Sequence, residues 1–250
     1  MKKIILSLLL LCAAVGIQAQ TDRYACWLNA ATGAWEWGFF KDFAVHDARQ
    51  WQYAAVKEGR KKTAVTLRSG KETLQLEIRY QNDSVCTIAV DDGKAQTYRL
   101  WNSAKSILSY LPADTAASRP CQFHENSVML RGYLPDFPNQ NLEYIYYERF
   151  QDTQKIANVP TDSIGRFELS IPVLGRTEVL FRIQSHMFSL LLSPQSECFL
   201  WIKGNSFLMM GENGRINHEL SDIQESFFVQ PKTLRYPNVA VSYTHLTLPT

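Results

Sequence analysis

Hydrophobic and polar residues alternate through most of the first hundred positions of the chain. In the segment TLQLEIRY every second residue is apolar, at Leu74, Leu76, Ile78 and Tyr80. This period of two places one face of a strand in a core and the other in water. Other runs with strand character are AWEWGFF, WQYAAV, TAVTLR, SVCTIAV and AQTYRLW, and turn sequences such as RSGKE and DDGK separate them. We therefore expect residues 20–110 to form an antiparallel meander of six to eight strands, either a folded sheet or a small barrel.

A second β unit follows a change in composition. Residues 111–126 are rich in proline and small polar residues, which is typical of a linker. Seven short apolar runs at roughly ten-residue spacing then predict a β-sandwich over 127–205. In TDSIGRFELSI, Asp162 is expected to set a turn, Gly165 to take a positive φ and Phe167 to begin an inward-facing series. Metal binding at Asp162 is not favoured, because no second carboxylate lies at ligand spacing.

The pattern changes again after Gly204. Residues 206–230 are predicted to contain an amphipathic helix with Asn213 as its N-cap. Its apolar stripe is formed by Ile216, Leu220, Ile223 and Phe227. His218 lies off this stripe and is expected to be a solvated surface histidine rather than a ligand. The predicted fold class is thus all-β, with a meander, a sandwich and one short helix.

The first residues have the layout of a secretory signal peptide. Two lysines precede an apolar run, and the small residue Ala19 marks the expected cleavage site, so residues 1–19 are predicted to be removed. The run is shorter than the roughly 20 residues that cross a bilayer, and the mature chain is not expected to span a membrane. Cys12 leaves lipid attachment as an alternative, although Leu11 precedes it where a small residue is usual. We expect export to the periplasm or cell envelope.

Charge narrows the choice of partners. The chain has 26 basic and 24 acidic residues, and removal of Lys2 and Lys3 brings the mature chain to net zero. Such a balance is not typical of nucleic-acid binding.

Four cysteines remain in the mature chain, and they are Cys26, Cys86, Cys121 and Cys198. They form no C-x-x-C pair and no cluster with histidine at metal-ligand spacing, so we expect no metal, no cofactor and no dithiol redox chemistry. In an exported protein they can form up to two structural disulfides. Buried free thiols are the alternative.

No catalytic constellation is predicted, and the chain as it stands is expected not to be an enzyme. Serine, histidine and aspartate are present without a nucleophile elbow, and no glycine-rich phosphate loop occurs. Two carboxylate pairs, Glu36 with Asp42 and Glu143 with Glu148, resemble acid/base pairs in spacing only. These carboxylates are better explained as charged residues on the solvent-exposed faces of strands.

An aromatic cluster in the meander has two interpretations. Its members are Trp27, Trp35, Trp37, Phe39, Phe40 and Trp51. Rings that line a groove can stack on sugars or bind apolar ligands, whereas the same rings can fill the interior of a β domain. The interior is favoured, with Trp35, Trp37 and Phe39 on one strand face and Phe40 on the other.

Three stretches in order suggest a family. They are VMLRGYLPDFPNQNLEYIYYE, then VPTDSIGRFELSIPV with FSLLLSPQSECFLWIKG, and finally FLMMGENGRINHELSDI. Together they resemble the N-terminal, non-catalytic region of exported TlpA-type thioredoxin-like proteins of Gram-negative anaerobes. The last stretch follows the family's G-x-N-x-x-x-N-x-E-L pattern through Gly211, Asn213, Asn217, Glu219 and Leu220. The resemblance covers roughly residues 127–225 and implies that a thioredoxin-like domain with C-x-x-C follows in cis.

The last ten residues, VSYTHLTLPT, resemble the translation of a transposase sequencing adapter at every position. We therefore expect natural sequence to end near Ala240, and residues 231–250 to form a tail without a fold of its own. Tyr243 and His245 are accordingly given no functional role.

Two functional hypotheses follow. The first is an accessory region of an exported thiol–disulfide oxidoreductase, whose catalytic domain is its partner in cis. The second is a free-standing exported binding or adhesion module for glycans or an outer-membrane partner. A periplasmic protein is a further partner considered for the chain. The second requires an exposed row of aromatic rings around Trp35 and Trp37.

Overall fold

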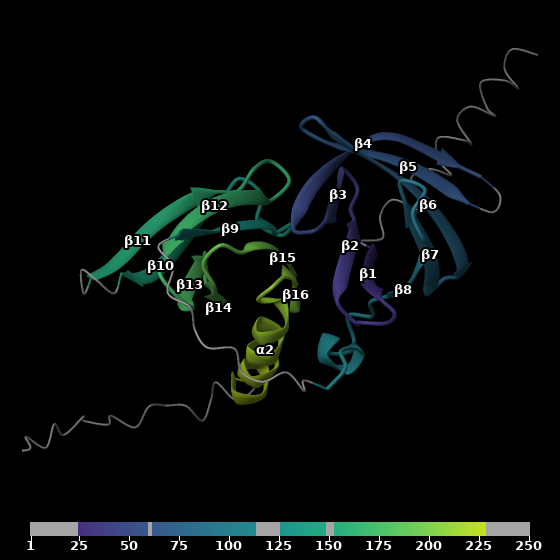
Figure 1. Cartoon of the computed structure of the whole chain (residues 1–250). Coiled ribbons are helices and arrows are strands. Elements are labelled where there is room, and N and C mark those ends of the chain that lie inside the picture. The colour runs from purple at the N-terminus through teal and green to yellow at the C-terminus, as the bar shows by residue number, and fades with distance from the viewer. Residues whose placement is uncertain (1–24, 60–61, 114–125, 149–152, 229–250) are drawn as a thin grey trace, which may run out of the picture.

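The chain folds into two β domains that lie side by side (Figure 1). This computed structural model describes residues 25–59, 62–113, 126–148 and 153–228. The expected signal peptide, Cys121, most of the linker and residues 229–250 lie outside the described residues. The all-β prediction is confirmed, because strands make up nearly all of the regular structure and a single α-helix ends the described part.

The N-terminal strands close into an eight-stranded antiparallel barrel, which decides between the two predicted forms of the meander. Each strand pairs with its neighbour in the chain, and the first strand closes the sheet by pairing with the eighth. The strands are β1 (Ala25–Asn29), β2 (Trp35–Phe39), β3 (Phe43–His46), β4 (Arg49–Glu58), β5 (Thr63–Ser69), β6 (Glu72–Asn82), β7 (Val85–Val90) and β8 (Gln96–Leu100).

Inward-pointing side chains fill the barrel, as expected for eight strands. Leu76 and Ile78 of β6 are buried, as the alternating pattern predicts. Tyr80, on the same strand, lies beside a β-bulge and is 50% exposed. Trp37 is fully buried and stacks on His46, with 3.7 Å between ring centroids. The rest of this cluster is Trp27, Ala44, Trp51, Val65, Leu67, Cys86, Ile88 and Tyr98.

The prediction that Trp35 and Trp37 share a strand face is wrong. β1 pairs Trp27 with Trp37, but its next residue, Leu28, pairs with Trp35. Glu36 is therefore an extra residue, a β-bulge, and it turns the two rings to opposite faces. Trp37 points into the barrel, whereas Trp35 joins an apolar cluster outside it.

The predicted sandwich consists of two four-stranded sheets with a shared core. Their strand orders are β11-β10-β13-β14 and β12-β9-β15-β16. The strands are β9 (Asn126–Tyr133), β10 (Asn141–Glu148), β11 (Thr153–Pro160), β12 (Arg166–Val173), β13 (Thr177–Ile183), β14 (His186–Leu192), β15 (Glu197–Lys203) and β16 (Ser206–Gly211). β16 lies in the segment expected to begin the helical region, so the sandwich extends to Gly211 rather than to residue 205.

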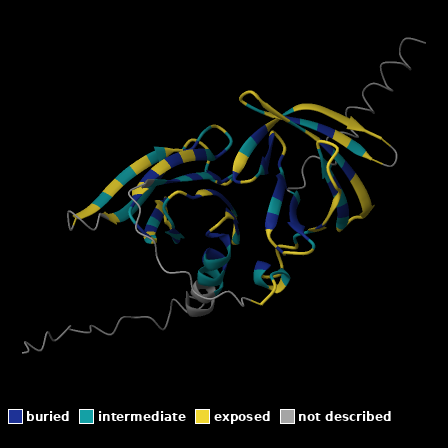
Figure 2. Ribbon diagram, viewed as in Figure 1, coloured by how far each residue is buried: buried dark blue, intermediate teal, exposed yellow. Residues whose placement is uncertain are grey.

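The barrel and the sandwich are joined by a third apolar cluster as well as by the linker, and buried residues line the facing strands (Figure 2). The barrel contributes Cys26, Leu28, Trp35, Phe40, Phe43, Val45 and Ala48, and the β12-β9-β15-β16 sheet contributes Tyr133, Phe199, Trp201, Leu208 and Met210. Ile107 of the short 3-10 helix η1 (Ile107–Tyr110) completes this interface. Phe43 and Tyr133 meet edge to face, with ring centroids 5.1 Å apart.

The β3–β4 turn inserts into this interface. Its central residues, Asp47 and Ala48, both have positive φ, as a tight hairpin of this kind requires. Ala48 is buried, its N–H donates to Met210 Sδ at 3.1 Å, and its carbonyl accepts from Arg131 at 3.3 Å. Arg131 also pairs with Glu197 at 2.8 Å. Polar contacts thus set the position of the turn on the sandwich.

One carboxylate organises the turn before β12. Asp162 Oδ1 accepts from the backbone N–H groups of Ile164 and Arg166, and Oδ2 accepts from Arg166 Nε at 2.7 Å. Burial would raise the pKa of Asp162, but these hydrogen bonds hold it below its usual value. Gly165 has φ +96°, and Phe167 is the first buried residue of the inward-facing series.

The cysteines in the described part are free thiols. Cys26, Cys86 and Cys198 are all buried, and no disulfide joins any two of them. Burial raises the pKa of each thiol, that of Cys86 to about 12. Because the thiolate is the reactive form, these three cysteines are poor nucleophiles at neutral pH.

Gly165→Ala is expected to destabilise the chain far more than Gly70→Ala. Both glycines have positive φ, but a Cβ at Gly165 would lie 2.1 Å from the Leu134 carbonyl oxygen, whereas Gly70 has no atom within 4 Å. Left-handed backbone alone costs a non-glycine residue about 1–2 kcal/mol. In urea unfolding, we expect the free energy of unfolding to fall by about 1–2 kcal/mol for Gly70→Ala. For Gly165→Ala we expect it to fall by at least about 3 kcal/mol. Equal losses would contradict this account of the turn.

Candidate functional site

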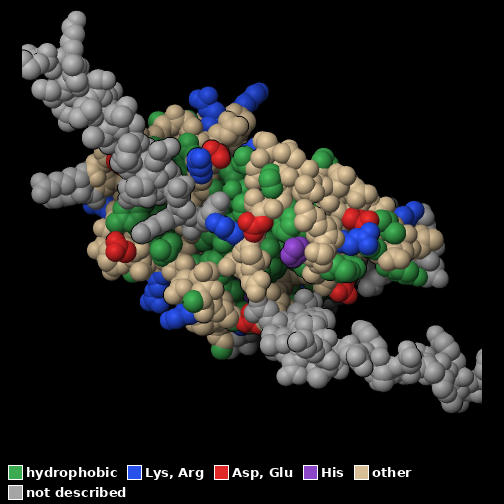
Figure 3. Space-filling view, turned by 180° about the vertical axis from the view of Figure 1, so that it is seen from behind, with side chains coloured by type: hydrophobic (Ala, Val, Ile, Leu, Met, Phe, Trp, Pro, Cys, Tyr) green, Lys and Arg blue, Asp and Glu red, His purple; other side chains and the backbone are tan. Residues whose placement is uncertain are grey.

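A groove runs between the barrel and the β15–β16 turn of the sandwich. Its larger part has a volume of about 960 Å³ and its smaller part about 470 Å³, and Trp101, Ser103 and Ser206 line both. Hydrophobic side chains are visible between the two domains in the space-filling view (Figure 3). We call this feature the interdomain groove. Its size lies within the range of sites that bind small molecules.

Aromatic rings from distant parts of the chain line the larger part of the groove. Tyr80 lies 6.0 Å from Trp27, and Trp101 meets Trp201 edge to face at 5.8 Å, measured between ring centroids. The indole N–H of Trp101 is buried but has no hydrogen-bond partner in the part of the chain that the structure describes. A buried indole N–H normally finds an acceptor, so the unpaired donor of Trp101 is an exception that costs stability.

The polar lining of the larger part is nearly balanced in charge. Asp83 and Asp136 carry negative charge and Lys203 carries positive charge. The Asp136 carboxylate already accepts a hydrogen bond from the Gly204 N–H at 2.7 Å. The remaining polar lining consists of the neutral side chains Gln81, Asn82, Ser103 and Ser206.

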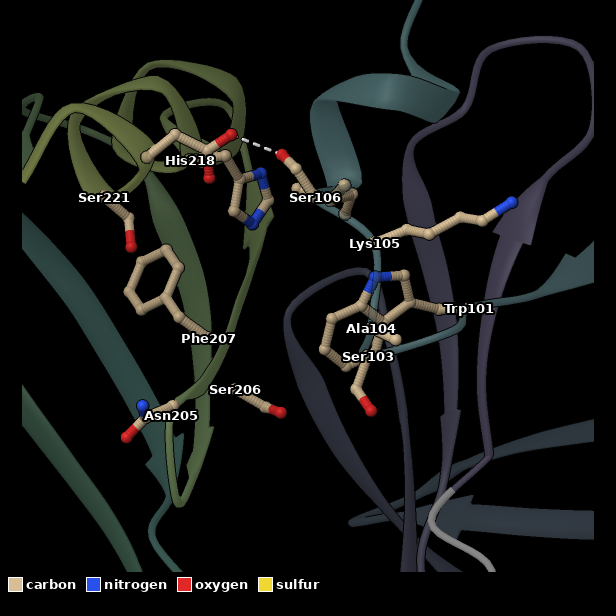
Figure 4. A pocket seen from close by; sticks show the side chains of 12 residues that line it. Trp101, Ser103, Ala104, Lys105, Ser106, Asn205, Ser206, Phe207, His218 and Ser221 are labelled. Carbon is tan, nitrogen blue, oxygen red and sulfur yellow. Dashed lines mark hydrogen bonds between the residues drawn. The ribbon is translucent and has the colours of Figure 1, made fainter. Parts of the chain in front are cut away.

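The smaller part lies between η1 and the helix α2 (Gly214–Phe228) (Figure 4). Serine, histidine and aspartate meet here, but their hydrogen bonds differ from those of a hydrolase triad. Ser106 donates directly to Asp222, and His218 Nε2 accepts from the backbone N–H of Met209 at 2.8 Å. The lone pair that a general base would need is therefore already occupied.

The prediction that His218 is a solvated surface residue is wrong. Its side chain is only 4% exposed, and burial lowers its pKa to about 4. Because Nε2 accepts a hydrogen bond, the neutral ring carries its proton on Nδ1. The hydrophobic periodicity places His218 outside the apolar stripe of the helix. In the structure, however, the side of the helix that carries His218 faces the sandwich.

Polar side chains of α2 cover the edges of both sheets. The Asn217 carboxamide accepts from the Leu191 N–H at 2.7 Å and donates to the Leu191 carbonyl at 2.9 Å. It thus acts towards β14 as a neighbouring strand would. On the other sheet, the backbone N–H of Met209 in the edge strand β16 donates to the His218 ring.

The residue before α2 is also buried. Asn213 occupies the predicted N-cap position, and its carboxamide bonds to Ser193, Ser196 and Cys198. By contrast, Ile216 and Leu220 of the predicted apolar stripe are only partly buried. The side chains of Ile223 and Phe227 lie outside the description. The sandwich therefore binds the asparagine and histidine side of α2.

The carboxylates considered as acid/base pairs have separate roles. Glu36 accepts from the Tyr98 hydroxyl at 3.0 Å, and Glu143 pairs with Arg182 at 2.8 Å. Asp42 is exposed, and the side chain of Glu148 lies outside the described residues.

The exposed aromatic row required for glycan binding at Trp35 and Trp37 does not occur, since the two rings are 4% and 0% exposed. Sequence reasoning missed the groove rings Tyr80, Trp101 and Trp201, because they come from β6, from the residue after β8 and from β15. No local pattern in the sequence connects these three segments.

The described residues form neither a metal-ion cluster nor a membrane-spanning helix. No group of three or more His, Cys, Asp or Glu side chains there is placed to hold a metal ion. In the same part of the chain, no helix is long and apolar enough to cross a membrane. In comparisons with known proteins, no family model, curated protein or solved structure matches this chain.

The buried His218 should make stability depend on pH. The unfolded chain takes up a proton at the ordinary histidine pKa, 6.5, whereas the folded chain does so only at about 4. Stability is therefore lost as the pH falls from 6.5 to 4, by about 3 kcal/mol from this group.

Urea unfolding across this pH window should show a steeper loss for the unaltered chain than for His218→Gln, whose amide oxygen can still accept from Met209. His186→Gln, at an exposed position, is the control and should keep the steep profile. Identical profiles for all three proteins would contradict a buried, neutral His218.

Proposed function

We propose that this chain is a non-catalytic accessory region of an exported thioredoxin-like protein. In this proposal the barrel and sandwich form a rigid support, and α2 leads into a redox domain that supplies the C-x-x-C pair. The resemblance of the Gly211-to-Leu220 segment to the entry of the family's helical region first suggested this role.

The proposal rests on the observation that α2 packs its polar side, not its apolar stripe, against the sandwich. An amphipathic helix usually buries its apolar stripe. Here Asn217 and His218 are buried instead, and Ile216 and Leu220 remain partly accessible for contact with another domain. A helix attached in this way positions a following domain more rigidly than a flexible tether does.

The described thiols are consistent with a supporting role. Cys26, Cys86 and Cys198 are buried in different places and have raised pKa values. Dithiol exchange needs a thiolate that is accessible and lies beside a second thiol. The proposal therefore assigns redox chemistry to the following domain.

Long-read sequencing of the gene beyond the Ala240 codon tests this function directly. We expect an uninterrupted reading frame with a C-x-x-C pair, and we expect the encoded protein, but not the present chain, to reduce insulin disulfides. A stop codon directly after Thr250, or a longer frame without the cysteine pair, would refute the proposal.

Variants of α2 separate anchoring from domain contact. Asn217→Ala should destabilise the present chain by about 2 kcal/mol or more, because it leaves both backbone groups of Leu191 unpaired. Leu220→Ser should cost about 1 kcal/mol or less here, because the side chain is only partly buried. In the longer protein the loss for Leu220→Ser should become clearly larger. Urea unfolding of both proteins measures the difference, and an unchanged loss would argue against domain contact at this stripe.

A further inference from the structure

We propose that the interdomain groove binds a neutral oligosaccharide. The larger part of the groove combines aromatic rings and neutral polar side chains in one open site of about 960 Å³. This inference does not depend on whether a redox domain follows α2.

The aromatic lining suits the apolar faces of sugar rings. Tyr80 lines the groove and is 50% exposed, and the Trp27 ring lies beside it, with 6.0 Å between the ring centroids. Trp101 is held edge to face against Trp201 and lines both parts of the groove. Rings held by neighbouring rings lose little conformational freedom when a ligand stacks on them.

The polar groups suit hydroxyl groups, which both donate and accept hydrogen bonds. Ser103 and Ser206, whose hydroxyls can do both, line both parts of the groove. The Gln81 and Asn82 carboxamides and the Ser103 and Ser206 hydroxyls add donors and acceptors along the same walls.

Charge argues against a strongly ionic ligand. Across both parts of the groove the acidic residues are Asp83, Asp136 and Asp222, and the basic residues are Lys105 and Lys203. This near balance provides neither a basic patch for phosphates nor a strongly acidic one for cations.

The backbone argues against an extended peptide. Peptides that bind by β-augmentation add a strand to an exposed sheet edge. The barrel wall of the groove has no such edge, because the barrel is closed and each strand pairs on both sides. Side chains, not strand edges, therefore provide recognition on this wall.

Titration of the purified chain with defined ligands tests the inference. The ligands are cellotetraose, maltotetraose, mannotetraose and chitotetraose, with a heparin tetrasaccharide and a neutral hexapeptide for comparison, followed by tryptophan fluorescence and calorimetry. We expect at least one neutral tetrasaccharide to bind with a Kd below about 1 mM. Tyr80→Ala should weaken this binding about tenfold, and Trp101→Phe, which offers a smaller ring face for stacking, by a smaller factor.

Tyr147→Ala is the matched control. This tyrosine is 48% exposed on β10 of the sandwich, does not line the groove, and should leave binding unchanged. Near-ultraviolet circular dichroism verifies that each variant keeps the native packing. The inference is overturned if no neutral tetrasaccharide binds at about 5 mM. It is likewise overturned if Tyr80→Ala and Trp101→Phe bind as the unaltered chain does, or if heparin or the hexapeptide binds more tightly.

Discussion

The structure depends on the hydrophobic contact between the outside of a closed barrel and the outside of a sandwich sheet. Burial of large aromatic side chains from both domains removes apolar surface that either domain alone would leave in water. The β3–β4 turn fixes how the two domains are oriented at this contact. Both the N–H and the carbonyl of Ala48 form hydrogen bonds with side chains of the sandwich. Non-directional burial and directional hydrogen bonds together set the orientation of the two domains.

This orientation creates the features of functional interest. The interdomain groove exists only because the end of the barrel faces the β15–β16 turn. The same arrangement brings η1 beside α2, where Ser106 bonds to Asp222. Both the proposed oligosaccharide site and the proposed support for a following domain therefore depend on a single interface.

The helix α2 shows how polar residues can stabilise a contact between elements. Asn217 and His218 are buried, which would be costly if their polar atoms were unpaired. Each meets the edge of a different sheet, so the helix closes two strand edges at once. Such side-chain pairing with backbone groups protects exposed edges from unwanted strand addition.

The sequence by itself determined the elements of this protein. Alternation identified Leu76 and Ile78 as core residues of one strand, and turn chemistry identified Asp162, Gly165 and Phe167 as a unit, because both signals are local. Tertiary structure alone decided the opposite faces of Trp35 and Trp37, since a one-residue bulge leaves no trace in periodicity. It also decided the burial of His218 and the meeting of Tyr80, Trp101 and Trp201 around one groove. Those outcomes depend on contacts between residues far apart in the chain, which no local pattern encodes.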